Sequence, residues 1–168
     1  MLKISEGVIV AGFGTVGKTF LSKKYNNILD LESSSYKYDY SCYENVDYEK
    51  LKGVPERKRN KEWPYNYYIA MKEAQKNYDI VFVQLNIQHL EYFDNNNIEY
   101  YIVYPSLDSW EWVKQRSINR GNNEKWLAGA EQVFEEYYIA SKNSKCKKMF
   151  MVNKHVSLED VLKENKFI

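Results

Sequence analysis

Short apolar runs alternate along this chain with longer segments in which apolar residues recur at helical spacing. Five runs rich in β-branched or aromatic residues predict strands, at residues 7–12, 28–31, 78–85, 98–105 and 146–153. Segments with helical composition predict helices at residues 18–25, 62–78, 86–97, 106–121, 123–143 and 157–165. This alternation predicts an α/β fold of three layers, in which a five-stranded parallel sheet lies between helices.

Boundary residues support several of the expected helices. Pro64 falls in the first turn of the second helix, a position where proline is tolerated. The fourth helix follows the capping residues Ser106 and Asp108 and ends at Gly121, and Ser157 caps the last helix. Right-handed crossovers then place the carboxyl ends of the parallel strands along one edge of the sheet, where ligands bind.

Residues 32–60 follow neither pattern. This stretch holds five tyrosines, few aliphatic residues and the basic run ERKRNK, and only DYEKLKG at 47–53 favours a short helix. We interpret it as an irregular excursion from the sheet. Because long excursions within compact domains often bind ligands or close over them, residues 33–61 are a candidate substrate-binding segment.

The turn after the first strand fits two nucleotide-binding patterns. Gly12 to Gly17 matches G-x-G-x-x-G, which holds the pyrophosphate of a dinucleotide, whereas Gly12 to Thr19 matches G-x-x-x-x-G-K-[ST], the P-loop. The dinucleotide interpretation also expects an acidic residue about 20 residues later, and Asp30 and Glu32 satisfy it. The glycines alone therefore leave both interpretations open.

The pair Lys18-Thr19 favours the P-loop. A P-loop needs a lysine that reaches the β- and γ-phosphates and a hydroxyl that ligates Mg²⁺, and both occur here in order. The short chain also leaves little room for the separate substrate domain of a dehydrogenase. The residues expected to hold ATP and Mg²⁺ are Gly12, Gly14, Thr15, Val16, Gly17, Lys18 and Thr19, with Thr19 and Asp30 at the metal.

Other motifs narrow the class of P-loop protein. A GTPase carries an acidic residue in N-K-x-D, but in VNKH no acidic residue follows Asn153 and Lys154, and no D-x-x-G follows a strand. An ATP-driven motor usually ends its third strand in an acidic residue, whereas the third strand here ends near Gln84. Both classes are therefore disfavoured.

The remaining pattern resembles the nucleoside monophosphate kinase-like superfamily of small P-loop kinases, and is similar to the small nucleotide-kinase-like proteins of many bacteriophages. The resemblance rests on the P-loop, on LDLESSS after the second strand and on WVKQRSINRG after the fourth. It implies that Asp30 acts on the acceptor or the metal. It also implies that Arg116 and Arg120 clamp the transferred phosphoryl group from a lid at about 105–125. The Asp-Gly-x-Pro-Arg motif of adenylate kinases is absent.

The same resemblance implies an acceptor site built from the excursion and the neighbouring strand ends. Its expected residues are Asp30, Glu32, Ser33, Ser34, Arg57 and Gln84. Tyrosines of the excursion suit stacking on a base, and its cations suit a phosphate. We therefore expect a kinase that transfers the γ-phosphate of ATP to a nucleoside or a nucleoside monophosphate. A regulatory protein that binds nucleotide without turnover is the alternative, and an NAD-binding protein is a weaker one.

Composition sets the remaining expectations. The chain has 168 residues with 24 Lys or Arg and 23 Asp or Glu, so its net charge of +1 favours neither a nucleic-acid polymer nor a membrane as a partner. We expect one domain over residues 1–168 and, from the lack of a signal peptide and the separated Cys42 and Cys146, a cytoplasmic protein. Two isolated histidines argue against a zinc site.

Overall fold

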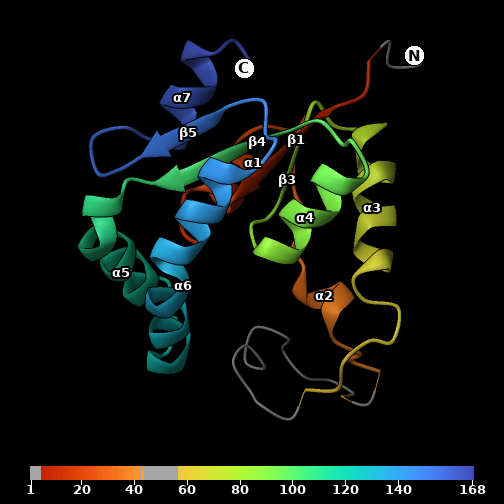
Figure 1. Ribbon diagram of the computed structural model, residues 1–168, viewed down its shortest axis with the longest axis horizontal. Helices are drawn as coiled ribbons and strands as arrows, with labels where there is room; N and C mark the ends of the chain where they lie inside the picture. The colour runs from red at the N-terminus through yellow and green to blue at the C-terminus, as the bar shows by residue number, and fades with distance from the viewer. Residues whose placement is uncertain (1–4, 42, 44–56) are drawn as a thin grey trace.

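Five parallel strands form one sheet in the computed structural model, which describes residues 5–41, 43 and 57–168 (Figure 1). The strands are β1 (Val8–Gly12), β2 (Ile28–Asp30), β3 (Ile80–Gln84), β4 (Tyr100–Pro105) and β5 (Met149–Val152). Their order in the sheet is β2-β3-β1-β4-β5, and every neighbouring pair is parallel. The predicted five-stranded parallel α/β sheet is confirmed.

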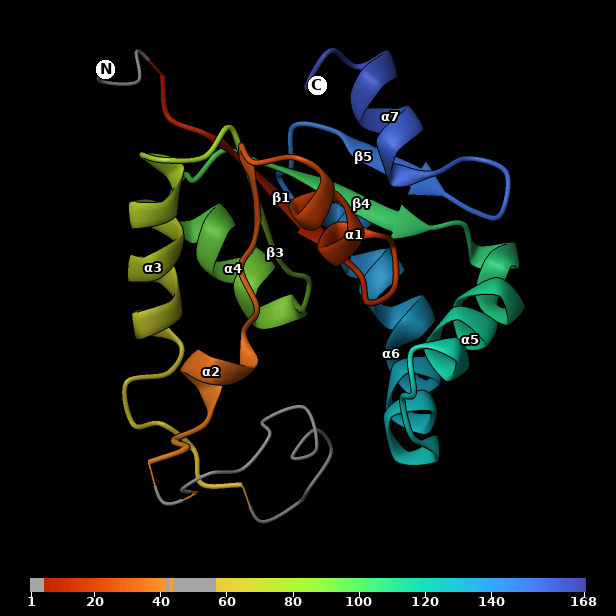
Figure 2. The ribbon, with the colours of Figure 1, turned by 180° about the vertical axis from the view of Figure 1, so that it is seen from behind.

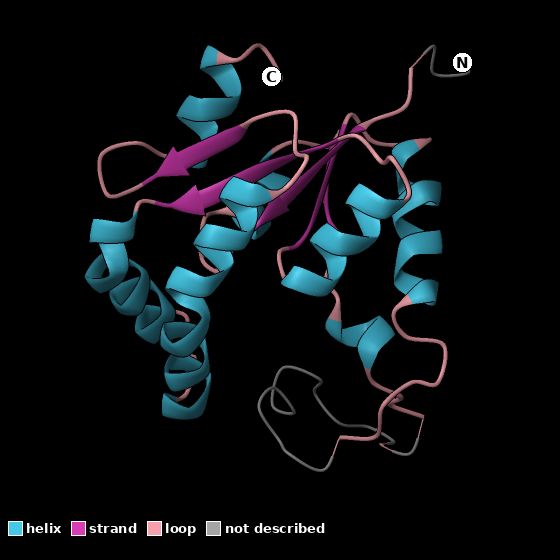
Figure 3. Cartoon of the chain, viewed as in Figure 1, coloured by secondary structure: helices cyan, strands magenta, loops and turns pink. Residues whose placement is uncertain are grey.

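Helices flank the sheet. They are α1 (Lys18–Lys24), α2 (Ser34–Lys37), α3 (Tyr65–Gln75), α4 (Ile87–Asn95), α5 (Trp110–Asn119), α6 (Glu124–Asn143) and α7 (Leu158–Glu164). Helices α4 and α6 lie in front of the sheet in Figure 1, and α1 lies in front of it when the molecule is seen from behind in Figure 2. Figure 3 shows the same alternation of strands and helices by secondary structure. No helix in the described ranges is long and apolar enough to cross a membrane.

The central strands are buried because they are nearly continuous apolar runs. Ile9, Val10 and Ala11 of β1 are fully buried, as are residues 80–83 of β3. The register pairs Gly12 with Gln84 on one side and with Val103 on the other. The glycine turn therefore begins level with the carboxyl end of β3 and close to that of β4, at the edge where the sequence places the ligand site.

Several elements differ from the sequence prediction in extent. The expected helix at 106–121 begins with a 3₁₀ turn at Leu107–Ser109, and α5 itself covers only Trp110–Asn119. Helix α2 was not predicted, because four residues are too few to show helical periodicity. The short helix predicted at 47–53 lies outside the described residues.

Candidate functional site

The glycine turn forms a compact loop between β1 and α1. Thr15 has φ 66° and Gly17 has φ 110°, so two residues of the loop are left-handed. Alternation of left-handed with other conformations points successive backbone N–H groups into one concavity that suits an anion. Val16, between them, is buried and anchors the loop to the core.

Lys18 lies across the mouth of this loop. Its Nζ donates hydrogen bonds of 2.9 Å to the carbonyl oxygens of Gly12 and Phe13. Burial lowers the pKa of Lys18, and the carboxylates of Asp30 and Glu32 oppose that shift. The ammonium group is thus held over the loop by two weak acceptors, ready to exchange them for the oxygens of an anion.

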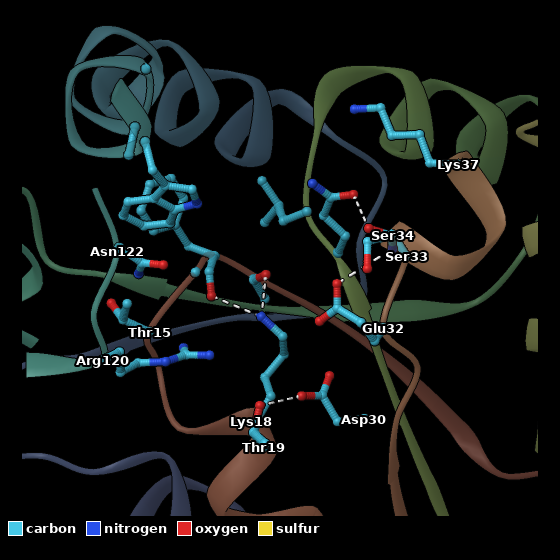
Figure 4. A pocket seen from close by; sticks show the side chains of 18 of the residues that line it. Thr15, Lys18, Thr19, Asp30, Glu32, Ser33, Ser34, Lys37, Arg120 and Asn122 are labelled. Carbon is cyan, nitrogen blue, oxygen red and sulfur yellow. Dashed lines mark hydrogen bonds between the residues drawn. The ribbon is translucent and has the colours of Figure 1, made fainter. Parts of the chain in front are cut away.

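Thr19, the next residue of α1, contacts the end of β2. Its Oγ1 donates a 2.7 Å hydrogen bond to Oδ2 of Asp30, and Figure 4 shows the pair beside Lys18. A hydroxyl and a carboxylate are hard oxygen ligands of the kind that Mg²⁺ prefers. No group of three His, Cys, Asp or Glu within the described residues could hold a metal alone. A magnesium ion at the Thr19–Asp30 pair would therefore complete its shell with water and phosphate oxygens.

A second polar pair spans the ends of β2 and β3. Ser33, which is buried, donates from Oγ to Oε1 of Gln84 at 2.7 Å. The Tyr67 hydroxyl stabilises the same junction, because it donates to the Leu31 carbonyl at 2.7 Å and accepts from the Gln84 N–H at 3.1 Å. Glu32 accepts from the backbone N–H of Ser34 at 3.4 Å. All four polar residues of this junction line the cavity, namely Glu32, Ser33, Ser34 and Gln84.

His89 supports this junction from beneath. It is fully buried, and its Nδ1 lies 2.9 Å from the Gln84 carbonyl oxygen, while its ring stacks on Tyr67. Burial lowers the pKa of His89 to about 4, so the ring is neutral at pH 7. His89 packs in the core and does not line the cavity.

The described part of the excursion adds cations to the same cavity. The Arg57 guanidinium carbon lies 3.8 Å from the centre of the Tyr38 ring, and the Lys37 Nζ lies 5.5 Å from the centre of the same ring. Arg57, Lys37 and Tyr38 all line the cavity. Tyr36 instead packs edge-on against Tyr67, and Tyr48 lies outside the described residues.

The two arginines expected in the lid have different environments. Arg120 directly follows α5 and lines the cavity, on the Thr15 side of Lys18 in Figure 4. Arg116 does not line the cavity. Its Nε donates a 2.9 Å hydrogen bond to the Thr15 carbonyl, and its guanidinium lies 4.9 Å from the centre of the Trp112 ring.

Helix α6 supplies a wall that the sequence analysis did not assign to the site. The cavity-lining residues on this helix are Lys125, Trp126, Gly129, Ala130, Val133 and Tyr137. Trp126 lies against the loop, since a methyl group at Gly14 would be only 3.0 Å from its Cζ2 atom. The nonpolar residues of α6 recur at helical spacing, and this was the only sequence signal for the wall. The same spacing also predicts a helix face buried against the core, so it did not identify a ligand site.

These residues enclose one cleft of about 480 Å³. Most residues that the sequence assigned to the site line it, namely Gly12, Gly14, Thr15, Lys18, Thr19, Asp30, Glu32, Ser33, Ser34, Arg57, Gln84 and Arg120. Val16, Gly17 and Arg116 belong to the loop or brace it without lining the cleft. The cleft therefore joins the glycine-rich loop, a hydroxyl–carboxylate pair and a partly aromatic wall.

No known protein-family model matches the chain, and a search of curated proteins found no significant match. The assignment of a function therefore rests on the geometry of the cleft and on the strand order.

The strand order distinguishes this sheet from the dinucleotide-binding fold. In that fold the order is 3-2-1-4-5-6, so the second strand lies beside the first. Here β3 separates β1 from β2. Asp30 at the end of β2, which would bind a ribose in the dinucleotide fold, instead accepts a hydrogen bond from Thr19.

Proposed function

We propose that this protein is a magnesium-dependent phosphotransferase that transfers the γ-phosphate of ATP to a nucleoside or a nucleoside monophosphate. The observation that carries the proposal is the hydrogen bond between Thr19 and Asp30, next to Lys18. In a P-loop, the lysine binds the β- and γ-phosphates and the adjacent hydroxyl ligates the metal. A carboxylate bonded to that hydroxyl has no comparable use in hydride transfer.

The residues of the cleft fit a bound magnesium ion and a triphosphate. Thr19 and Asp30 would hold the ion, which would neutralise part of the charge on the phosphates. Lys18 would exchange its bonds to the Gly12 and Phe13 carbonyls for phosphate oxygens. Arg120 adds a second positive charge on the far side of Lys18 from Asp30, which favours a site where negative charge increases in the transition state.

During transfer, an oxygen of the acceptor would bond to the γ-phosphorus while the bond to the β,γ-bridging oxygen breaks, and ADP would leave with that electron pair. The carboxylates of Asp30 and Glu32 line the cleft, and they would orient a hydroxyl acceptor and take up its proton as its oxygen bonds to phosphorus. A phosphate acceptor has no such need, because its attacking oxygen is already ionised. In both cases catalysis depends on positioning and on electrostatic stabilisation.

The α6 wall of the cleft and the Ser33–Gln84 pair suit an acceptor with a flat ring and polar edges. Trp126, Val133 and Tyr137 give one wall an apolar, partly aromatic surface. The Ser33–Gln84 pair across the cleft offers hydrogen-bonding groups of the kind that recognise a base edge. Arg57 and Lys37 provide positive charge for an acceptor phosphate. A small sugar would make little use of the aromatic wall.

A second candidate is a nucleotide-binding regulatory protein without turnover. The observation in its favour is that β3 ends in Gln84, an uncharged residue, where many P-loop ATPases carry an acidic residue. The intact Lys18 and the Thr19–Asp30 pair favour catalysis over binding alone.

The decisive experiment is a screen for ATP consumption with Mg²⁺ and three sets of acceptors: nucleosides, nucleoside monophosphates and small hydroxyl metabolites. We expect turnover on the first or second set, and its loss in a Lys18→Ala variant. Turnover only on the third set would refute the nucleotide acceptor, and tight binding of ATP without any turnover would favour the regulatory candidate. Calorimetric titration with NAD and with MgATP tests the loop itself, since preference for NAD would overturn the P-loop assignment.

A further inference from the structure

Thr15 has a backbone conformation that its own side chain does not favour. Its φ of 66° is left-handed, which is unusual for a β-branched residue. The residue is 3% exposed, and its Oγ1 has no hydrogen-bond partner among the described residues. The hydroxyl of Thr15 therefore does not explain why the loop adopts this conformation.

Arg116, from a distant part of the chain, forms a hydrogen bond that holds the Thr15 backbone. Its Nε donates a 2.9 Å hydrogen bond to the Thr15 carbonyl oxygen, 101 residues away in sequence. The guanidinium lies over the Trp112 ring and is partly withdrawn from water; burial and the charge of Arg120 lower the pKa of Arg116. Packing on the ring restricts the direction of the guanidinium, and a hydrogen bond from a charged donor is stronger than a neutral one.

The direction of this carbonyl matters for the anion-binding loop. A peptide bond is planar and trans, so the N–H of Val16 points opposite to the carbonyl of Thr15. By holding that carbonyl towards α5, Arg116 sets the orientation of one of the N–H groups of the loop. Arg120, one turn further along, is positioned differently and lines the cleft.

We propose that Arg116 is a positioning residue that holds Thr15 in its left-handed conformation and so preorganises the loop, and that it does not contact the transferred phosphate. The effect on the loop is a property of the protein alone. Its consequence for nucleotide affinity rests on the proposed function.

A double-mutant cycle between Arg116→Ala and Thr15→Gly tests this inference. Glycine adopts the left-handed region without steric cost, so the loop no longer needs Arg116 to hold it there. We expect Arg116→Ala to raise the Kd for MgATP about tenfold in the wild-type background and clearly less in the Thr15→Gly background. Arg116→Lys, which retains a donor, should recover part of the affinity. Arg120→Ala in place of Arg116→Ala should give equal losses in the two backgrounds.

The same cycle measured by denaturant unfolding without nucleotide separates the two proposals. Coupling between Arg116 and Thr15 in unfolding, together with no binding of MgATP by the wild-type protein, would refute the phosphotransferase and retain the positioning role. Equal losses of affinity on removing Arg116 in both backgrounds would overturn the positioning role. If Arg116→Ala does not fold, the double-mutant cycle is made with Arg116→Lys and Thr15→Gly. Equal losses of MgATP affinity in the two backgrounds would again overturn the positioning role.

Discussion

The hydroxyl of Thr19 and the carboxylate of Asp30 meet at 2.7 Å, although they belong to different elements of the fold. Thr19 lies in the first turn of α1, and Asp30 is the last residue of β2. Although β3 separates β1 from β2 in the sheet, α1 packs against β2 and brings Thr19 to Asp30. The pair forms an oxygen-rich position beside Lys18, and the Asp30 carboxylate favours the charged form of that lysine.

Removal of either partner should weaken the use of magnesium. Thr19→Ala and Asp30→Asn are expected to raise the Mg²⁺ concentration for half-maximal turnover by about 10–100-fold, as changes around metal ligands typically do. Thr19→Ser keeps the hydroxyl and serves as the control. Titration of activity with MgCl₂ at fixed ATP measures the effect, and an unchanged Mg²⁺ requirement in Asp30→Asn would remove this carboxylate from the metal site.

Substitution of Lys18 should separate catalysis from stability. Burial lowers the pKa of Lys18, so the fold penalises its charged form. Lys18→Met keeps the aliphatic stem and removes that penalty. We expect kcat to fall by about 10²–10³-fold or more, with an unfolding midpoint equal to or above that of the wild type. Lys23→Met, on the exposed side of the same helix, is the control. Retained turnover in Lys18→Met would mean that the loop is not catalytic.

Gly129 offers a test in which stability and activity change in opposite directions. It lies inside α6, lines the cleft, and has open space around the position of a Cβ atom. Gly129→Ala should stabilise the protein by about 0.5–1 kcal/mol, because alanine loses less conformational entropy in a helix.

The added methyl group should raise the KM for the acceptor and leave the Kd for MgATP unchanged, and Gly129→Leu should strengthen the effect. Ala128→Leu adds bulk at an exposed position of the same helix that does not line the cleft. If Gly129→Leu leaves the acceptor KM unchanged, α6 does not form the acceptor wall.

Glu159 links α7 to α1 and should contribute to the pH dependence of stability. Its carboxylate contacts Lys163 at 2.8 Å, Lys24 at 2.9 Å and the Tyr25 hydroxyl. These hydrogen bonds, that from Lys163 first, lower the pKa of Glu159 from 4.5 to about 2. A depressed carboxylate pKa stabilises the fold above the unfolded-state value, and this contribution is lost as the pH falls from 4.5 towards 2.

Glu159→Gln should therefore lower the Tm at pH 7, and the difference from the wild type should shrink between pH 4.5 and 2. Thermal unfolding followed by circular dichroism over this range gives the comparison. Glu164→Gln, an exposed position on the same helix, should follow the wild-type curve. A constant difference across the range would show that Glu159 acts by packing and not by its charge.

Patterns of neighbouring residues were enough to predict the five strands, most of the helices and the glycine-rich loop. Strands appear as buried apolar runs, and helices begin and end at recognisable residues, because these signals lie within a few residues of one another. The P-loop pattern is also contiguous, so Lys18 and Thr19 could be assigned roles without knowledge of the fold. The boundaries of α5 and the existence of α2 were less accessible, since short turns leave little periodic signal.

Only the tertiary structure decided which of these residues meet. The chain alone does not state the order β2-β3-β1-β4-β5, and it is this order that brings Asp30 to Thr19 and Ser33 to Gln84, 51 residues away. The resemblance to small P-loop kinases implied one common role for Arg116 and Arg120. In the structure Arg116 instead donates to the Thr15 carbonyl, and Arg120 lines the cleft. The face of α6 was missed for the same reason: periodicity shows that residues share a face, and packing alone decides whether that face meets the core or a ligand.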